Sequence, residues 1–123
     1  MSNKVEFQLV NLSNPSAPIL AIHKADTFGS RFLGLMGKKS IDRISGLLFA
    51  QSRPSRIDAA IHMFFMQFDI AAIWLDQNYV VISAALAKKW HPFYMPVRPA
   101  SFILETHPDR LADFRVGDTL QVQ

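Results

Sequence analysis

The chain has 123 residues, contains no cysteine, is half hydrophobic and carries a formal net charge of +3. This length predicts a single domain over residues 1–123, with enough apolar residues to bury a core. The absence of cysteine excludes disulfide bonds, thiolate catalysis and zinc or iron–sulfur sites built on cysteine. Because the net charge is small and the basic residues are scattered, nucleic acid is not an expected partner.

The N-terminal sequence MSNKVEFQLVN has no apolar segment of the kind found in a signal peptide. No stretch approaches the roughly 18 apolar residues that a membrane span needs. We therefore expect a soluble, cytoplasmic protein that does not bind a membrane. The sequence leaves the oligomeric state open.

The chain opens with two predicted strands. Residues 5–10 alternate apolar and polar side chains, which is typical of a half-buried strand. Segment 11–18 is rich in Asn, Ser and Pro and predicts a turn, and the apolar run at 19–23 predicts a second strand. The pattern favours a hairpin of these two strands.

A short helix is predicted over residues 27–36. From Phe28 onward, apolar side chains recur at i, i+4, i+7 and i+8, which is the spacing of one helical face. Asp26 or Thr27 can cap its N-terminus, and Gly37 is suited to end it.

The rest of the chain alternates further strands with loops. The expected elements are, in order, a short buried strand at 46–49, a polar loop at 51–58, an antiparallel hairpin of 70–76 and 79–87, an irregular segment at 88–100, a strand at 101–106, a helical turn at 108–114 and a last strand within 116–122. Six or seven short strands with so little helix predict an α+β fold with a mostly antiparallel or mixed β-sheet, which can be curled toward a barrel. Alternating strand–helix order is missing, which argues against a doubly wound fold.

Several motifs follow one another in a recognisable order. An Arg-x-x-Gly-Leu-Met motif occupies residues 31–36, and an aromatic-rich segment containing Met66 leads into a strand that ends at Asp76. The sequences GLLF, KKW, ASFILET and VGDTL complete the order. Together these motifs resemble the uncharacterised DUF192 family, also called UPF0127, over roughly residues 26–123. The resemblance implies a compact, mostly β domain with no established activity.

The chain departs from that family's pattern in two places. The family usually has Pro-Ile/Leu-Asp ahead of the strand, whereas residues 69–71 read Asp-Ile-Ala. Ala71 thus stands where the family has aspartate, and Asp69 is the candidate to replace it. After Leu104 and Glu105, the glycine often found in the family is replaced by THPD.

An apolar and aromatic cleft is the predicted binding site. We expect it between the helix at 27–36, the segment 62–66 and the loop 90–94. The candidate ligand-binding residues are Arg31, Gly34, Met36, His62, Met66, Trp90, Tyr94 and Glu105. Arg31 offers a bidentate fork for an anion, or alternatively an ion pair with Asp76 or Glu105. Gly34 costs helix propensity, which suggests that a backbone or ligand approaches closely there.

Each candidate also has a structural interpretation. The Met and Phe side chains of segment 63–68 can simply fill the core, and those of the loop 90–94 can cover a sheet edge. Turn chemistry would explain Asp76, and a solvated strand end would explain Glu105. The four histidines show no metal-binding spacing, so neither a metal nor a cofactor is predicted.

Three functions compete. The favoured one is a non-enzymatic small-molecule-binding or accessory domain with its cleft beside Arg31. The second is a small hydrolase that uses Glu105 with Asp76 or His62 as acid and base. The third is a nucleic-acid-binding module, suggested by a pI near 9.5 and the basic, aromatic segment 88–98.

Overall fold

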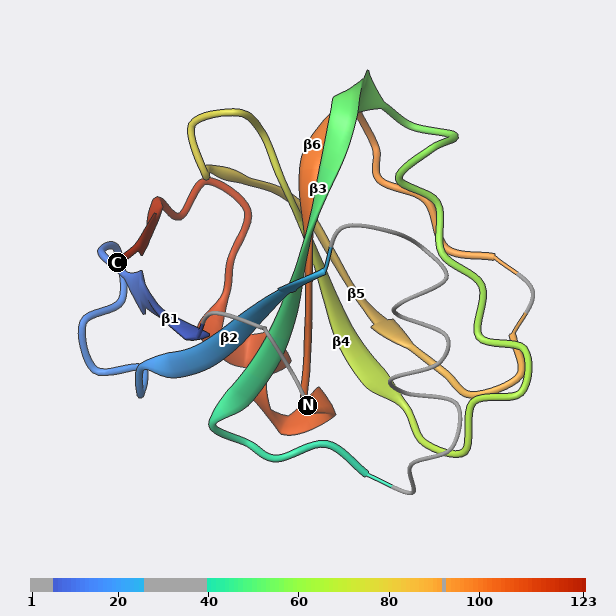
Figure 1. Ribbon diagram of the computed structural model, residues 1–123, viewed down its shortest axis with the longest axis horizontal. Coiled ribbons are helices and arrows are strands. Elements are labelled where there is room, and N and C mark those ends of the chain that lie inside the picture. Colours follow the sequence, from blue (N-terminus) through green and yellow to red (C-terminus); the bar gives the residue numbers. More distant parts are fainter. Residues whose placement is uncertain (1–5, 26–39, 92) are drawn as a thin grey trace.

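A computed structural model describes residues 6–25, 40–91 and 93–123 (Figure 1). The helix predicted over residues 27–36 lies outside the described residues, and so do the candidate site residues Arg31, Gly34 and Met36. In chain order the elements are β1 (Glu6–Asn11), β2 (Leu20–Ala25), β3 (Ser45–Ser55), β4 (Ile70–Leu75), β5 (Val81–Ala87), β6 (Ala100–Thr106), the 3-10 helix η1 (Pro108–Asp113) and β7 (Leu120–Val122).

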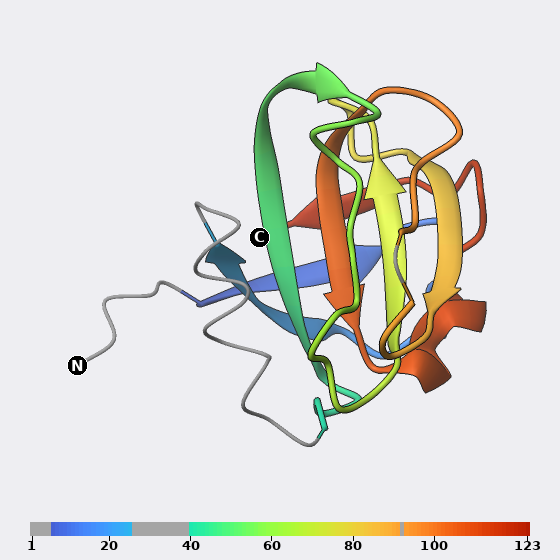
Figure 2. The same cartoon turned by 90° about the vertical axis from the view of Figure 1, so that its right-hand side faces the viewer.

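The seven strands form one mixed sheet in the order β5-β4-β6-β3-β2-β1-β7. Strands β2 and β3 pair in parallel, and every other neighbouring pair among the described strands is antiparallel. The sheet curls into a half-barrel (Figure 2). Its two outer strands approach each other where Val80 pairs with Thr119. The predicted β-rich α+β class with a mixed sheet is therefore confirmed.

Local predictions for the hairpins and the helical turn hold as well. β1 pairs antiparallel with β2, and β4 pairs antiparallel with β5. The helical turn predicted at 108–114 is the 3-10 helix η1, with Pro108 in its first turn, where its missing N–H is not needed.

The polar loop predicted at 51–58 is wrong in its first half, because β3 continues to Ser55. The register between β3 and β6 shifts between Ala50 and Ser55. Such an irregularity accommodates Pro54, which cannot donate a hydrogen bond to a ladder. Polar, exposed residues can form a strand when a neighbouring strand supplies partners for their backbone hydrogen bonds. Here that strand is β6, and the local sequence of residues 51–55 does not reveal it.

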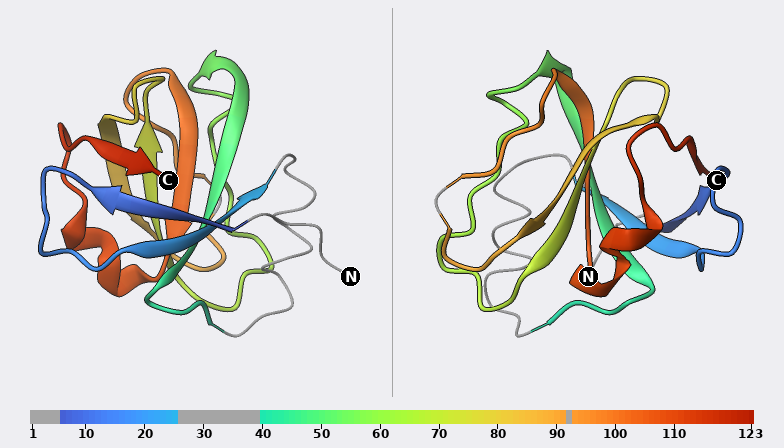
Figure 3. Two further views of the ribbon diagram at one scale, coloured as in Figure 1. Left: turned by 60° about the vertical axis from the view of Figure 1, so that its left-hand side comes forward. Right: turned by 180° about the vertical axis from the view of Figure 1, so that it is seen from behind.

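Both faces of the central sheet are covered, which explains why periodicity was uninformative in β4. Every residue of β4 is buried. Alternate side chains enter two cores, with Trp74 in one and Ile73 in the other. The first, which we call the loop-side core, lies under residues 56–69, 88–91 and 93–99. The second, the barrel-side core, lies toward β1, β2, β7 and η1 (Figures 1 and 3).

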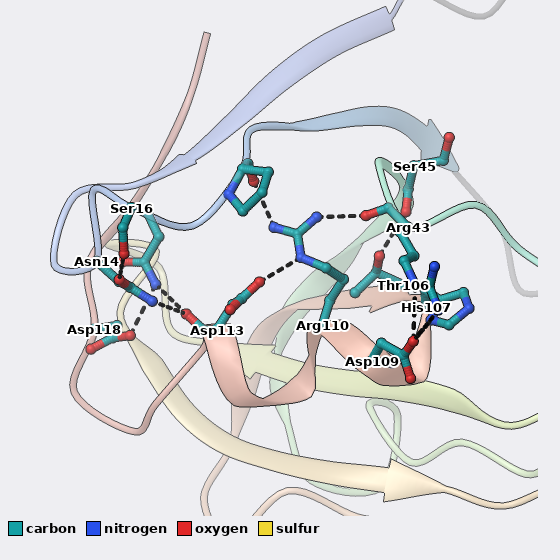
Figure 4. A network of polar contacts seen from close by, with 12 residues as sticks. Asn14, Ser16, Arg43, Ser45, Thr106, His107, Asp109, Arg110, Asp113 and Asp118 are labelled. Carbon is teal, nitrogen blue, oxygen red and sulfur yellow. Dashed lines mark hydrogen bonds and ion pairs between the residues drawn. The ribbon is translucent and has the colours of Figure 1, made fainter.

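A buried arginine joins three parts of the chain at the barrel side. Arg110 of η1 is only 5% exposed. Its guanidinium donates hydrogen bonds to the backbone oxygens of Pro18 and Arg43 and to the carboxylate of Asp113 (Figure 4). These bonds tie η1 to the chain ahead of β2 and ahead of β3, and so fix one end of the half-barrel.

Candidate functional site

The two described segments of the predicted cleft do lie against each other. Ile61 and Tyr94 exchange two backbone hydrogen bonds, with N–O distances of 2.9 and 2.8 Å. Trp90 N–H donates to the Met63 oxygen at 2.7 Å, and Met63 N–H donates to the His91 oxygen at 3.0 Å. Residues 62–66, 90–91 and 93–94 therefore form one backbone-linked layer over the sheet.

Two aromatic residues in this layer have a strained backbone. Phe65 and Trp90 have φ values of 65° and 69°, in the left-handed region that residues other than glycine seldom adopt. Their rings meet edge-on with centroids 5.2 Å apart. Phe65 is 58% and Trp90 55% exposed. We call Phe65 and Trp90 the aromatic pair.

The other predicted residues of this layer differ in exposure. Met66 is buried in the loop-side core, as its structural interpretation anticipated. Tyr94 is partly buried against the same core, and its hydroxyl accepts a hydrogen bond from Lys88 N–H at 2.9 Å. His62 is partly buried, with its ring 5.4 Å from that of Phe64.

The expectation of a solvated strand end for Glu105 is wrong, because Glu105 is fully buried. It pairs with Leu47 of β3 and Ala72 of β4, whose side chains belong to the loop-side core. Glu105 shares this face, since directly opposed residues in a sheet point to the same side. β6 is flanked by strands on both sides, so its end is not an open edge.

Asp76 lies far from Glu105. Glu105 is opposite Ala72, so Asp76 is displaced by four residues along β4, or about 13 Å at the usual rise of a strand. One carboxylate oxygen of Asp76 accepts the N–H groups of Asn78 and Val80 at 2.8 and 3.0 Å, which accounts for Asp76 by turn chemistry. This separation argues against Asp76 and Glu105 acting as one acid–base pair.

A cavity of about 230 Å³ opens at one end of the sheet. The chain enters β3 and β4 and leaves β5 and β6 at this end, because β6 runs antiparallel to β3 and β4, and β5 runs antiparallel to β4. The lining residues are Ser40, Ile41, Phe68, Asp69, Lys89, His107 and Pro108. None of them is among the predicted ligand-binding residues.

Asp69 and Ala71 have different surroundings. Ala71 is fully buried in the barrel-side core. Asp69 precedes β4 at the cavity, where its Oδ1 accepts the Lys89 N–H at 2.9 Å. The suggestion that Asp69 replaces the family's aspartate stays a prediction.

The 3-10 helix beside the cavity begins with a charged cluster. His107 Nδ1 accepts the Asp109 N–H at 3.0 Å. Arg43 donates to the Asp109 carboxylate at 2.6 Å, and this hydrogen bond lowers the pKa of Asp109 below its ordinary value (Figure 4). The charge of His107, when protonated, lowers that pKa further.

Among residues 6–25, 40–91 and 93–123, no three His, Asp or Glu side chains gather as a metal site would require. In the same part of the chain, no helix has the length and apolar character needed to cross a bilayer. The predicted absence of a cofactor stays a prediction.

Comparison with known proteins identifies the family. The model of the DUF192 family, described as "Uncharacterized ACR, COG1430", matches residues 10–122. The chain belongs to the DUF192 family. A UPF0127 protein of Thermococcus kodakarensis is 44% identical over 66% of this chain, and one of Pyrococcus furiosus is 35% identical over 79% of it.

Coverage of these DUF192 relatives varies. The match spans 50% of the Thermococcus kodakarensis protein and 53% of one from Thermococcus gammatolerans, so the chain spans about half the length of these two relatives. It spans 80% of the Pyrococcus furiosus protein.

Solved structures show the same fold. A Sinorhizobium meliloti protein described as a "putative transcription regulator" superposes with a TM-score of 0.78 at 16% identity, covering 97% of this chain and 93% of its own. A protein of unknown function from Novosphingobium aromaticivorans gives a TM-score of 0.77 at 19% identity, covering 96% and 84%. At such identities the likeness establishes the fold alone.

Proposed function

We propose that this DUF192 chain is a cytoplasmic, non-enzymatic domain that binds a ring-bearing small molecule on the aromatic pair. The observation that carries the proposal is that Phe65 and Trp90 are both strained and both more than half exposed. A left-handed backbone at a residue other than glycine costs on the order of 1–3 kcal/mol and persists where the surrounding structure enforces it, often at ligand sites.

A third strained residue provides a contrast. Tyr79 also has a positive φ, of 61°, but it lies in the β4–β5 turn, and its ring stacks on Phe102 at 4.5 Å. Phe65 and Trp90 also lie in turns, closed by the hydrogen bonds from Met66 N–H to the Met63 oxygen and from His91 N–H to the Lys88 oxygen, both at 3.2 Å. The difference lies in the rings: that of Tyr79 is packed on Phe102, whereas those of the aromatic pair contact each other yet remain largely open to solvent.

The surroundings indicate what the pair would bind. Exposed aromatic rings offer flat apolar surfaces for stacking against a sugar or aromatic ring. The exposed Lys88 and Lys89 directly precede Trp90, which suits a neutral or anionic ligand better than a cation. Arg31 and Glu105 remain candidates for the predicted cleft.

The test is an NMR screen of the ¹⁵N-labelled chain against monosaccharides, short oligosaccharides, nucleosides and aromatic acids. We expect saturable shifts that cluster on the amides of residues 63–66 and 88–94. A library that never produces such a cluster would contradict the proposal.

A glycine variant separates binding from folding. Glycine adopts the φ of Trp90 at no steric cost, so Trp90→Gly should remove ring stacking while its backbone strain is relieved. We expect ligand binding to fall at least about tenfold while the chain remains folded. The control is Val116→Ala, which truncates an exposed apolar side chain outside the loop layer and should bind like the parent. Unchanged binding by Trp90→Gly would refute a role for the aromatic pair.

A further inference from the structure

The cavity at the end of the sheet contains two opposite charges that do not neutralise each other. Asp69 and Lys89 both line it, and Asp69 Oδ1 accepts the Lys89 backbone N–H. Their side chains nevertheless form no ion pair with each other or with any other group in residues 6–25, 40–91 and 93–123. The second carboxylate oxygen of Asp69 and the Lys89 ammonium thus remain available to a ligand.

His107 adds a hydrogen-bond donor to the lining. Its Nδ1 accepts the Asp109 N–H, so the neutral ring carries its proton on Nε2. The apolar part of the lining is provided by Ile41, Phe68 and Pro108. The cavity therefore combines a carboxylate, an ammonium group, an imidazole N–H and an apolar wall, and Ser40 adds a hydroxyl.

We propose that this cavity binds a free α-amino acid with an apolar side chain. The ligand's ammonium pairs with Asp69, and its carboxylate pairs with Lys89 and accepts the Nε2–H of His107. Its side chain lies against Phe68 and Ile41. A ligand that carries both charges satisfies Asp69 and Lys89 together, which a simple anion or cation cannot do.

The cavity's size limits the ligand to a small molecule. Its volume of about 230 Å³ is below the roughly 300–1,000 Å³ typical of pockets for drug-sized ligands. A single amino acid is therefore preferred to a peptide. This site goes beyond the proposed function, because neither member of the aromatic pair lines the cavity.

The experiment is an NMR titration of the ¹⁵N-labelled chain with L-leucine and two analogues. N-acetyl-leucine lacks the ammonium and leucinamide lacks the carboxylate, while both retain the side chain. We expect leucine to give saturable shifts at residues 40–41, 68–69, 89 and 107, with each analogue at least about tenfold weaker. No saturation by about 10 mM leucine, or equal binding of all three molecules, would overturn the proposal.

Charge-only variants complete the test. Asp69→Asn keeps an oxygen that can accept the Lys89 N–H, and Lys89→Gln keeps most of the side-chain length, so both should fold normally. Each should weaken leucine binding about tenfold or more, whereas the matched controls Asp58→Asn and Lys88→Gln, which change exposed residues outside the lining, should not. Equal loss in variants and controls would contradict the assignment.

One further variant separates this proposal from the proposed function. Trp90→Gly should retain leucine binding even where it abolishes binding to the aromatic pair. Loss of leucine binding in Trp90→Gly, with Asp69→Asn unaffected, would place the amino acid on the aromatic pair and overturn the cavity assignment.

Discussion

Replacing Arg110 by Met should destabilise the fold strongly, because it removes a buried charge that has three hydrogen-bonded partners. The substitution keeps an apolar stem but removes a guanidinium that is 5% exposed and donates to Asp113, Arg43 and Pro18. The Asp113 carboxylate and two backbone oxygens then lose their donor together. The guanidinium also lies 5.9 Å from the centre of the Phe114 ring, and that contact is lost as well.

The expected loss of stability in Arg110→Met follows from the burial of this ion pair. Removing one partner of a buried ion pair costs about 3–5 kcal/mol, because the other charge stays buried without compensation. The Asp113 side chain is 29% exposed, so water partly compensates it, and the lower end of about 3 kcal/mol applies. For a domain of this length, that loss lowers Tm by about 10 °C.

Urea and thermal denaturation, followed by circular dichroism, measure this effect. Arg43→Ala is the matched control, because it removes an arginine whose ion pair with Asp109 is exposed, at 68% and 55% for the two side chains. We expect a much smaller change in Arg43→Ala than in Arg110→Met. If Arg110→Met melts within about 3 °C of the parent, the hydrogen bonds of Arg110 do not hold η1 to the chain ahead of β2 and β3 as proposed.

Three further variants test the packing and the charges of the same sheet end. Gly46→Ala should lower the free energy of unfolding, measured by urea denaturation, by about 1–2 kcal/mol. The reason is that its new Cβ would lie 3.2 Å from the Glu105 backbone oxygen and 3.3 Å from the Leu104 side chain. A more stable variant would contradict this packing. Thr106→Val should lower the free energy of unfolding by about 1 kcal/mol in the same assay, since the buried hydroxyl donates to the Ser45 backbone oxygen at 2.7 Å. An unchanged midpoint of urea denaturation would show that this hydrogen bond does not contribute to stability. Asp109→Asn should lower Tm at pH 7, because the Arg43 hydrogen bond that lowers the pKa of Asp109 stabilises the fold only while the carboxylate is ionised. The difference in Tm between variant and parent should disappear as the pH falls below about 4, where the carboxylate of the parent becomes protonated. A difference in Tm that persists at low pH would exclude this charge as the cause.

Local sequence was sufficient to predict most of the strands. Alternation in residues 5–10 and β-branched residues around the Asp76 turn identified the β1–β2 and β4–β5 hairpins, since both depend on neighbours close in sequence. The continuation of β3 to Ser55 was missed, because its partner β6 lies about 50 residues later and polar side chains gave no local signal.

The candidate site was predictable in part. Aromatic residues grouped in two segments identified the layer around Trp90 and Tyr94, because apolar side chains outside regular strands must cover a sheet. The end cavity was not predicted, because its lining comes from four separate segments that only the strand order brings together. The burial of Glu105 was missed for the same reason, since a strand end in sequence need not be a sheet edge in space.

Tryptophan fluorescence reports directly on ligand binding to the aromatic pair. The chain has two tryptophans; Trp74 is fully buried and donates to the Ala59 oxygen, whereas Trp90 is 55% exposed, so acrylamide should quench mainly Trp90. We expect a ring-bearing ligand found in the NMR screen to protect this emission from quenching in the parent. It should have no such effect in Trp90→Phe, where the remaining emission comes from Trp74. Equal quenching of the parent with and without saturating ligand would contradict binding at Trp90.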